Sequence, residues 1–238
     1  MIIIDPGHGG SDIGGGSNNF WQEKDLALKI SLYQYQRFLE LGIKVNMTRN
    51  SDLTLSPLER TNKAKSYSTG KNDLIISNHI NVDFGNYDGA EVVYSKYDSN
   101  ALAKLIAKNL EAFGQKLSTN EIYTRLNSRG EDYYYIIRNT RPIQTVLIEY
   151  GFADSKGDDI NQLLYNWQAL AEALVKSVCE YFGYKYTYNL ERYTVKENDT
   201  LSKIAQKYNT TVDAIRNLNG LTSDLIYPGD SLLIPKNN

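Results

Sequence analysis

The chain has 238 residues, enough for one sizeable hydrophobic core and a small second domain. Hydrophobic residues make up 41% of the sequence and charged residues 23%, which is ordinary for a globular protein. The net charge of −2 provides no basic surface, which argues against nucleic acid as a partner. No apolar run is long enough to span a bilayer, which argues against membrane insertion.

Predicted strands and helices alternate along the first 184 residues. Short apolar runs typical of buried strands lie at Ile2–Ile4, Ile43–Met47, Leu74–Ser77, Ala90–Tyr94, Tyr134–Arg138 and Thr145–Ile148. Helical patterns separate several of them, at Lys24–Leu41, from Ser56 and Pro57 to about Tyr67, at Leu102–Phe113 and at Leu163–Tyr181. This alternation predicts an α/β fold in which a mostly parallel, twisted sheet of about six strands is flanked by helices.

The pattern changes after Gly183. Residues 185–191 have no clear helical period, and we expect them to link a first domain at 1–184 to a second at 192–238. The elements predicted in the second domain are a strand at Tyr193–Val195, a helix from Thr200 to about Tyr208, a helix from Thr211 or Val212 to about Asn217, and a strand at Ser231–Ile234. A unit this small has a marginal core and depends on tight local packing.

Both histidines of the chain follow predicted strands. His8 comes after Asp5-Pro-Gly, and His79 comes after Ser77-Asn. Ligands of open α/β sheets bind in the crevice beyond the carboxyl ends of the strands, so two imidazoles delivered there indicate part of a metal site. A single histidine would more often be a satisfied core or surface residue.

The third ligand of such a site would be a carboxylate. A catalytic zinc site uses three protein ligands and one open position. The chain has two histidines and one cysteine, Cys179, which is best explained as a small buried hydrophobe. Glu23 is the best candidate, because it follows the glycine-rich segment and starts a predicted helix. Its alternative role is that of an acid that complements the helix dipole.

Glu149 ends the buried run Thr145–Ile148. A carboxylate at the tip of a buried strand, beside a metal, is suited to act as a general base. The alternative is an exposed acid at a strand end.

These segments together resemble the zinc-dependent N-acetylmuramoyl-L-alanine amidases of the amidase-3 family. Between Ile2 and about Phe182, and in the family's order, the resembling segments are Asp5–Gly10, Glu23–Leu28, Thr48–Arg49, Leu58–Arg60, Ser77–Asn81 and Val146–Phe152. The resemblance implies cleavage of the amide bond between N-acetylmuramic acid and L-alanine of the peptidoglycan stem peptide. It implies Zn²⁺ held by His8, Glu23 and His79, with Glu149 as the catalytic acid and base for zinc-activated water.

Several positions leave more than one role open. Asn78 and Ile80 stand where the family usually has an aliphatic and a small residue, and we expect them to reshape the pocket floor. For Arg49 and Arg60, structural ion pairing and substrate contact are both open. Tyr133–Tyr135 either line the substrate cleft or begin an edge strand. The segment Gly114–Asp132 is too short for a long occluding helix, so we expect an open site.

The C-terminal unit resembles a LysM module. The resembling positions are Tyr193–Ala205, Tyr208, Thr211, Ile215, Asn219, Tyr227–Asp230 and Leu233–Pro235. Asn198 stands where the module usually has glycine, and asparagine tolerates a left-handed backbone. The resemblance implies a βααβ fold that binds N-acetylglucosamine-containing glycan in a groove lined by Asp199, Thr200, Leu201, Leu225, Ile226 and Tyr227. Each apolar residue of this set has a core position as its alternative. A tethered wall-binding module would raise the effective concentration of the enzyme at its polymer.

Other functions fit the sequence less well. A zinc peptidase acting on wall peptides is the nearest rival, but neither histidine has the H-E-x-x-H or H-x-x-E spacing of such enzymes. The glycine-rich start lacks the Gly-Lys-Ser/Thr of a phosphate loop. A non-catalytic wall-binding protein would be expected to have lost a ligand or Glu149, and all four residues are present.

Met1 leads directly into the first apolar run, without the basic segment and cleavage site of a secretory signal peptide. We therefore expect synthesis in the cytoplasm and action at the bacterial cell wall after release, by a holin or by cell lysis. This favours a phage or prophage endolysin, with a host autolytic or sporulation amidase as the alternative.

Overall fold

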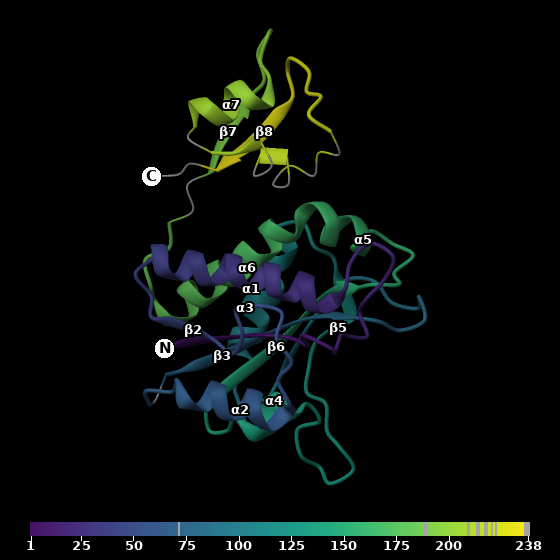
Figure 1. Cartoon of the computed structure of the whole chain (residues 1–238), viewed down its shortest axis with the longest axis vertical. Helices are drawn as coiled ribbons and strands as arrows, with labels where there is room; N and C mark the ends of the chain where they lie inside the picture. The colour runs from purple at the N-terminus through teal and green to yellow at the C-terminus, as the bar shows by residue number, and fades with distance from the viewer. Residues whose placement is uncertain are drawn as a thin grey trace.

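The computed structural model describes residues 1–70, 72–187, 190–208, 210–212, 215–216, 219, 221 and 223–235. Its larger part is a six-stranded sheet between two helical layers (Figure 1). The strands are β1 (Ile2–Pro6), β2 (Val45–Met47), β3 (Leu74–Asn81), β4 (Ala90–Tyr94), β5 (Leu117–Tyr123) and β6 (Gln144–Phe152). The helices are α1 (Glu23–Glu40), α2 (Pro57–Ser66), α3 (Ala101–Ala112), α4 (Tyr135–Asn139), α5 (Asp159–Asn161) and α6 (Trp167–Phe182), with a π-helical turn at Gln162–Asn166.

The order of the strands creates a crevice at one end of the sheet. The order is β2-β1-β3-β6-β4-β5, with β1, β2, β3 and β6 parallel, β4 antiparallel to β6, and β5 parallel to β4. The chain leaves β1 towards β2 and then returns past β1 to β3. Because such crossovers are right-handed, α1 and α2 lie on opposite faces of the sheet. Ligands bind where the strand order reverses in this way, here at the carboxyl ends of β1 and β3. The predicted fold class, a mostly parallel sheet flanked by helices, is confirmed.

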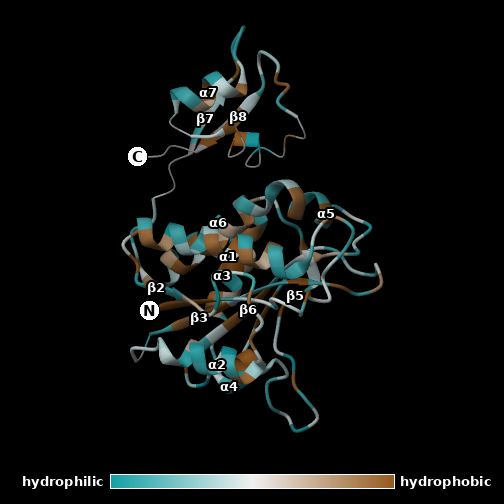
Figure 2. Cartoon of the chain, in the orientation of Figure 1, coloured by the Kyte–Doolittle hydropathy of each residue, from teal (hydrophilic) through white to brown (hydrophobic). Residues whose placement is uncertain are grey.

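Alternating strand residues fill a core on each face of the sheet. Ile4, Ile76 and Ile148 belong to the core under α1, α3 and α6. Ile75 and Leu147 belong to the smaller core under α2 and α4. Figure 2 shows apolar residues along the strands and hydrophilic residues on much of the outer helical surface. Burial on both faces explains why these strands have nearly continuous apolar sequences.

One predicted strand of the larger sheet is wrong, and one strand of that sheet was not predicted. The expected strand Tyr134–Arg138 is wrong: α4 occupies this segment, and Arg138 Nη1 donates to the carbonyls of Asp132 and Tyr133 at 2.6 and 2.7 Å. A run of four or five apolar residues does not distinguish a strand from a helical turn. The sixth strand is β5, an edge strand with too few apolar residues to be predicted.

The start of α2 was predicted correctly, but the start of the helix predicted from Leu163 was not. α2 begins as expected, with a capping box in which the Glu59 N–H donates to Ser56 Oγ at 3.3 Å and the Glu59 carboxylate accepts from the Ser56 N–H at 2.8 Å. The helix predicted from Leu163 is α-helical only from Trp167 onwards, because a π-helical turn precedes it. Both Leu163 and Trp167 are nevertheless buried, so the predicted apolar face is retained.

The C-terminal region contains a small antiparallel sheet of β7 (Leu190–Thr194) and β8 (Ser231–Pro235). Helix α7 (Leu201–Lys207) begins after Thr200, whose Oγ1 accepts from the Lys203 N–H at 3.2 Å. Asn198 has a φ of 64°, the left-handed conformation expected for it. Residues 213, 214 and 217 of the second predicted helix, which was expected from Thr211 or Val212 to about Asn217, lie outside the described residues. Among the described residues, no helix is both long and apolar enough to cross a membrane.

Candidate active site

A left-handed turn beyond β1 presents His8. The φ of His8 is 57°, a conformation that costs a residue with a Cβ about 1 kcal/mol or more, so neighbouring contacts must hold it. Arg60 donates to the carbonyls of Pro6 and His8 at 2.5 and 2.6 Å. Arg49, which is 1% exposed, donates to the carbonyls of Pro6 and Gly7 at 3.1 and 2.6 Å. Both arginines therefore have a structural role, which is to fix the histidine turn.

Glycines leave room for the other two candidate ligands. A Cβ on Gly7 would lie 2.4 Å from the His79 ring, and a Cβ on Gly14 would lie 2.4 Å from a Glu23 carboxylate oxygen. The Gly16 N–H donates to Glu23 Oε2 at 2.8 Å. The glycine-rich segment thus encloses a carboxylate of the chain itself.

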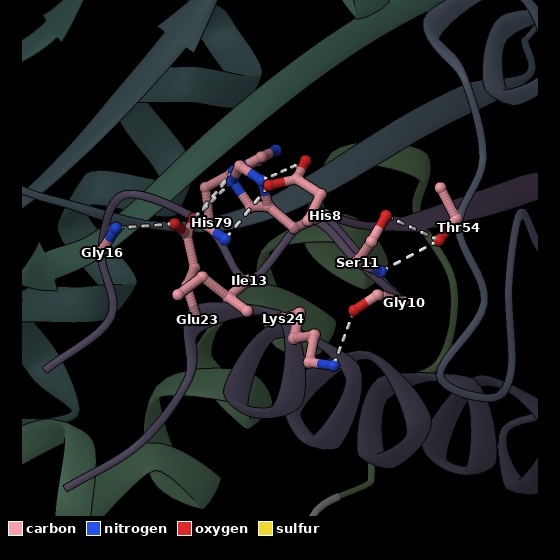
Figure 3. A network of polar contacts seen from close by, with 12 residues as sticks. His8, Gly10, Ser11, Ile13, Gly16, Glu23, Lys24, Thr54 and His79 are labelled. Atoms are coloured by element: carbon pink, nitrogen blue, oxygen red, sulfur yellow. Dashed lines mark hydrogen bonds and ion pairs between the residues drawn. The ribbon is translucent and has the colours of Figure 1, made fainter. Parts of the chain in front are cut away.

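His8, Glu23 and His79 converge on one point (Figure 3). Glu23 is the first residue of α1 and is 2% exposed, and its Oε1 lies 3.2 Å from His8 Nε2 and 3.0 Å from His79 Nδ1. The same oxygen accepts from the Ile80 N–H at 3.0 Å. One candidate ligand atom from each of the three side chains lies within 4.8 Å of the other two. Asp12 Oδ2 lies 2.9 Å from the other ring nitrogen of His8 and so orients the ring.

Hydrogen bonds within the cluster stabilise the ionised forms of Glu23 and His8. Burial works against ionisation of Glu23, but hydrogen bonds with His79 and His8 outweigh it and hold the pKa of Glu23 well below its usual range. Burial alone would lower the pKa of His8, yet hydrogen bonds with Glu23 and Asp12 raise that pKa above its ordinary value. The cluster therefore favours positive charge beside a buried carboxylate.

Glu149 lies on β6 between two polar side chains of neighbouring strands. It is paired with His79 on β3 and with Glu91 on β4. Paired residues of adjacent strands point to the same face of a sheet, so all three share the face covered by α2 and α4. Glu149 is 6% exposed, and its Oε2 has no hydrogen-bond partner among the described residues. Burial, followed by the charges of Glu23 and Glu91, raises the pKa of Glu149 well above its usual value. Glu149 is therefore not an exposed strand-end acid, and a carboxyl of this kind is suited to exchange protons.

A pocket of about 170 Å³ opens beside the two histidines. Its walls are formed by Asp5, His8, Asp12, Leu55, Pro57, Arg60, His79, Tyr134, Tyr135, Ile136 and Leu147. Tyr134 and Tyr135 thus line the cleft. Tyr133 is 47% exposed and lies under the guanidinium of Arg125, whose central carbon is 4.0 Å from the ring centre.

Asn78 and Ile80 do not form the pocket floor, so this expectation is wrong. Alternation along β3 turns them away from His79, towards α1. Asn78 Nδ2 donates to Ser31 Oγ and Gln34 Oε1, each at 2.8 Å, and the Tyr150 hydroxyl donates to Asn78 Oδ1 at 3.1 Å. These residues form a buried polar cluster under α1.

The sequence analysis missed two carboxylates of the site. Asp12 orients His8, and the spacing of four residues was its only signal. Glu91 is 2% exposed on β4, and its signal was a charged residue inside an apolar strand. Its carboxylate accepts from the side chains of Asn81, Ser118, Asn120 and Tyr123.

The six residues expected to line a glycan groove have different environments. Leu201 is 1% exposed and belongs to the small core, against which Ile226 also packs. Thr200 caps α7, and Asp199 accepts from the Tyr193 hydroxyl at 2.7 Å. Leu225 and Tyr227 are exposed. Leu225, Tyr227 and the exposed Thr200 are therefore the members of the set that a polymer can reach, and Leu225 and Tyr227 offer it the larger apolar surface.

The donor set of the first domain fits zinc. Zinc takes nitrogen and oxygen ligands at about 2.0–2.2 Å, which puts neighbouring ligand atoms of a tetrahedron about 3.3 Å apart. The two contacts of Glu23 Oε1, at 3.2 and 3.0 Å, are close to this spacing. Two imidazoles and one carboxylate also match the ligands of catalytic zinc sites that keep a fourth position open. Glu149 Oε2, which has no hydrogen-bond partner within the described ranges, adds a proton acceptor on the same face of the sheet.

Comparison with known proteins gives the family of the chain. The sequence model of the N-acetylmuramoyl-L-alanine amidases (Amidase_3) matches residues 2–180, and the chain belongs to this family. The sequence model of the LysM domain matches residues 193–235, so the chain also contains a LysM domain.

Individual relatives are similar over about three quarters of the chain. A Staphylococcus aureus protein described as a probable cell wall amidase, LytH, is 33% identical over 189 residues, which are 76% of this chain and 58% of that protein. The chain thus spans less than two thirds of the length of this relative. Cwp6 from Clostridium difficile has a similar structure, with a TM-score of 0.67 and 32% identity over 75% of this chain and 28% of that one. The CwlD amidase from Clostridioides difficile, solved with the GerS lipoprotein, has a TM-score of 0.64 and 26% identity over 77% of this chain and 98% of that one.

Proposed function

We propose that this chain is a zinc-dependent N-acetylmuramoyl-L-alanine amidase, which cleaves the amide bond between N-acetylmuramic acid and L-alanine of peptidoglycan. The observation that carries the proposal is the convergence of His8, Glu23 and His79 beside Glu149, a buried carboxyl whose Oε2 has no partner in the part of the chain that the structure describes. Membership of the amidase family supports the choice of substrate bond.

In the proposed hydrolysis, three of the site residues bind the metal and Glu149 transfers a proton. His8, Glu23 and His79 would hold zinc, which supplies a Lewis acid for the amide carbonyl and lowers the pKa of water towards about 7. Glu149 accepts a proton from the attacking water as the new carbon–oxygen bond forms. It then returns this proton to the nitrogen of alanine as the carbon–nitrogen bond breaks. The products are the carboxylate of the lactyl group and a free alanine amine.

Fixed geometry contributes to this reaction. The two arginines hold the histidine turn through four carbonyl contacts, and Asp12 orients the His8 ring. Because these contacts exist before the substrate arrives, little reorganisation is needed during the reaction. The pocket between α2 and α4 lies beside both histidines and is the place for the substrate group next to the amide.

Digestion of purified peptidoglycan sacculi tests the proposal. Treatment with the protein should release alanine amino termini without new reducing sugar ends, and a chelator should abolish the release. New amino termini on a residue other than alanine would instead indicate a zinc peptidase. An endolysin and a host autolytic or sporulation amidase, the two roles proposed from the sequence, carry out the same cleavage, so this assay tests the reaction.

We propose that the LysM domain holds the enzyme on the wall glycan through Leu225 and Tyr227. Replacing Tyr227 by Ala in the full chain should reduce retention on insoluble peptidoglycan about fivefold or more, since an exposed aromatic ring loses its contact with the sugar. Leu32→Ala, at an exposed position of α1, is a control that should leave retention unchanged. Equal retention of the Tyr227 and Leu225 alanine variants and the wild type would contradict this assignment.

A further inference from the structure

A hairpin beside the pocket carries an arginine that the proposed mechanism does not use. The chain between β5 and α4, the teal loop that projects from the sheet in Figure 1, contains no helix. Its base is closed by a hydrogen bond from the Tyr133 N–H to the Arg125 carbonyl at 2.7 Å and by the bridge between Leu126 and Asp132. Tyr134, the next residue, lines the pocket together with His8 and His79.

Aromatic contacts orient the side chain of Arg125. Its guanidinium carbon lies 4.0 Å from the ring centre of Tyr133 and 6.0 Å from that of Tyr134. Holding an arginine side chain in one position costs conformational entropy. Such an arrangement is expected where a positive charge must meet a ligand at a defined position.

The charge of Arg125 has no carboxylate partner among the described residues. The two acids of the hairpin are engaged elsewhere: Glu131 Oε2 lies 3.3 Å from Arg129 Nε, and Asp132 accepts from the Ser95 hydroxyl and the Lys96 N–H at 2.7 and 3.0 Å. Arg125 is also exposed, so a ligand can reach it. The Arg125 guanidinium carbon lies 6.0 Å from the ring centre of Tyr134, which lines the pocket. Arg125 is therefore suited to bind an anionic group of a ligand in that pocket.

We propose that Arg125 binds a carboxylate on the peptide part of the substrate and so makes the enzyme prefer peptides with a free carboxylate near the cleaved amide. This inference rests on the proposed amidase function. The glycan part offers no comparable anion, because the lactyl carboxyl of N-acetylmuramic acid is itself bound in the amide that is cut. Guanidinium and carboxylate groups form paired hydrogen bonds, which lysine cannot reproduce.

Two synthetic substrates that differ only in charge test the proposal. They are N-acetylmuramoyl-L-alanyl-glutamate with both carboxyls free and the corresponding diamide. The wild type should have a KM about tenfold lower for the acid than for the diamide. Arg125→Gln should raise the KM for the acid about tenfold, leave kcat within twofold, and leave the kinetics on the diamide unchanged. Arg125→Lys should restore only part of the preference. Arg129→Gln, on the same hairpin, should behave like the wild type.

Each other outcome refutes one specific claim. If Arg125→Gln slows cleavage of both substrates equally, the residue has only a structural role and the proposal is wrong. If the variant keeps the preference of the wild type for the acid, the carboxylate is bound elsewhere and the proposal is also wrong. If the wild type cleaves neither substrate, the proposed amidase function fails, and the failure is then distinguishable from that of Arg125 alone.

Discussion

Replacement of Glu149 by Gln separates the proton-transfer role of this side chain from the metal-binding role of its neighbours. Glutamine keeps the size and shape of the side chain but cannot accept and return a proton. General acid–base catalysis contributes typically about 10²- to 10⁴-fold. At about 1.4 kcal/mol for each tenfold change, the variant should lose about 3–5 kcal/mol of transition-state stabilisation. Its zinc content should stay at that of the wild type.

The same substitution should change stability in a pH-dependent way. The folded-state pKa of Glu149 is raised, so the stability contribution of this group is present below its unfolded pKa and is lost as the pH rises through the folded pKa. Glutamine does not ionise and avoids this loss. In chelator-treated protein, Glu149→Gln should therefore be more stable than the wild type at pH 8, by about 1.4 kcal/mol for each unit of the raised pKa, and the difference should shrink towards pH 4.

The measurements are release of free amine from sacculi, zinc by elemental analysis, and denaturant unfolding of the metal-free proteins. Glu172→Gln is a matched control, because Glu172 is also a buried glutamate but lies on α6, where it is paired with Arg37 at 2.9 Å. This control should lose stability and keep its zinc and its activity within a few-fold. A zinc-loaded Glu149→Gln that retains most of the wild-type activity would refute the assignment of Glu149 as the base.

Three further substitutions test how the metal cluster is built. His79→Ala should remove stoichiometric zinc as measured by elemental analysis, and a variant that still binds one equivalent would exclude His79 as a ligand. Asp12→Asn should weaken zinc binding about 10- to 100-fold in a competition titration with a chelator, because Asp12 orients His8; unchanged affinity would show that its contact has no such role. Gly7→Ala should lose zinc and activity together, since the new Cβ would lie 2.4 Å from the His79 ring, whereas wild-type zinc binding by this variant would contradict the packing described here.

Much of the sheet could be predicted from the sequence because its central strands are buried on both faces. β4 has the predicted bounds Ala90–Tyr94, and β1 and β3 begin at the predicted residues. β5 could not be predicted, since an edge strand has one exposed side and needs no apolar run. The segment Tyr134–Arg138 shows the converse: two buried isoleucines suffice for a helical turn as well as for a strand.

Some site residues, like the central strands, can be identified from the local sequence, whereas others are positioned only by tertiary contacts. The position of Glu23 depends on Gly14 and Gly16, close to it in the sequence, and His8 lies in the same glycine-rich segment, so a local motif identified both residues. The position of Glu91 beside Glu149 depends on the pairing of β4 with β6, which the sequence alone does not contain. Asn78 lies outside the pocket because side chains alternate along β3, which turns Asn78 and His79 to opposite faces of the sheet.

The central claim is that His8, Glu23 and His79 share one zinc ion. X-ray diffraction with anomalous data at the zinc absorption edge, on crystals of the active protein, tests it most directly. We expect one anomalous peak about 2.0–2.2 Å from His8 Nε2, His79 Nδ1 and a Glu23 carboxylate oxygen. Active protein with no metal at this position, or with its metal bound by other residues, would contradict it.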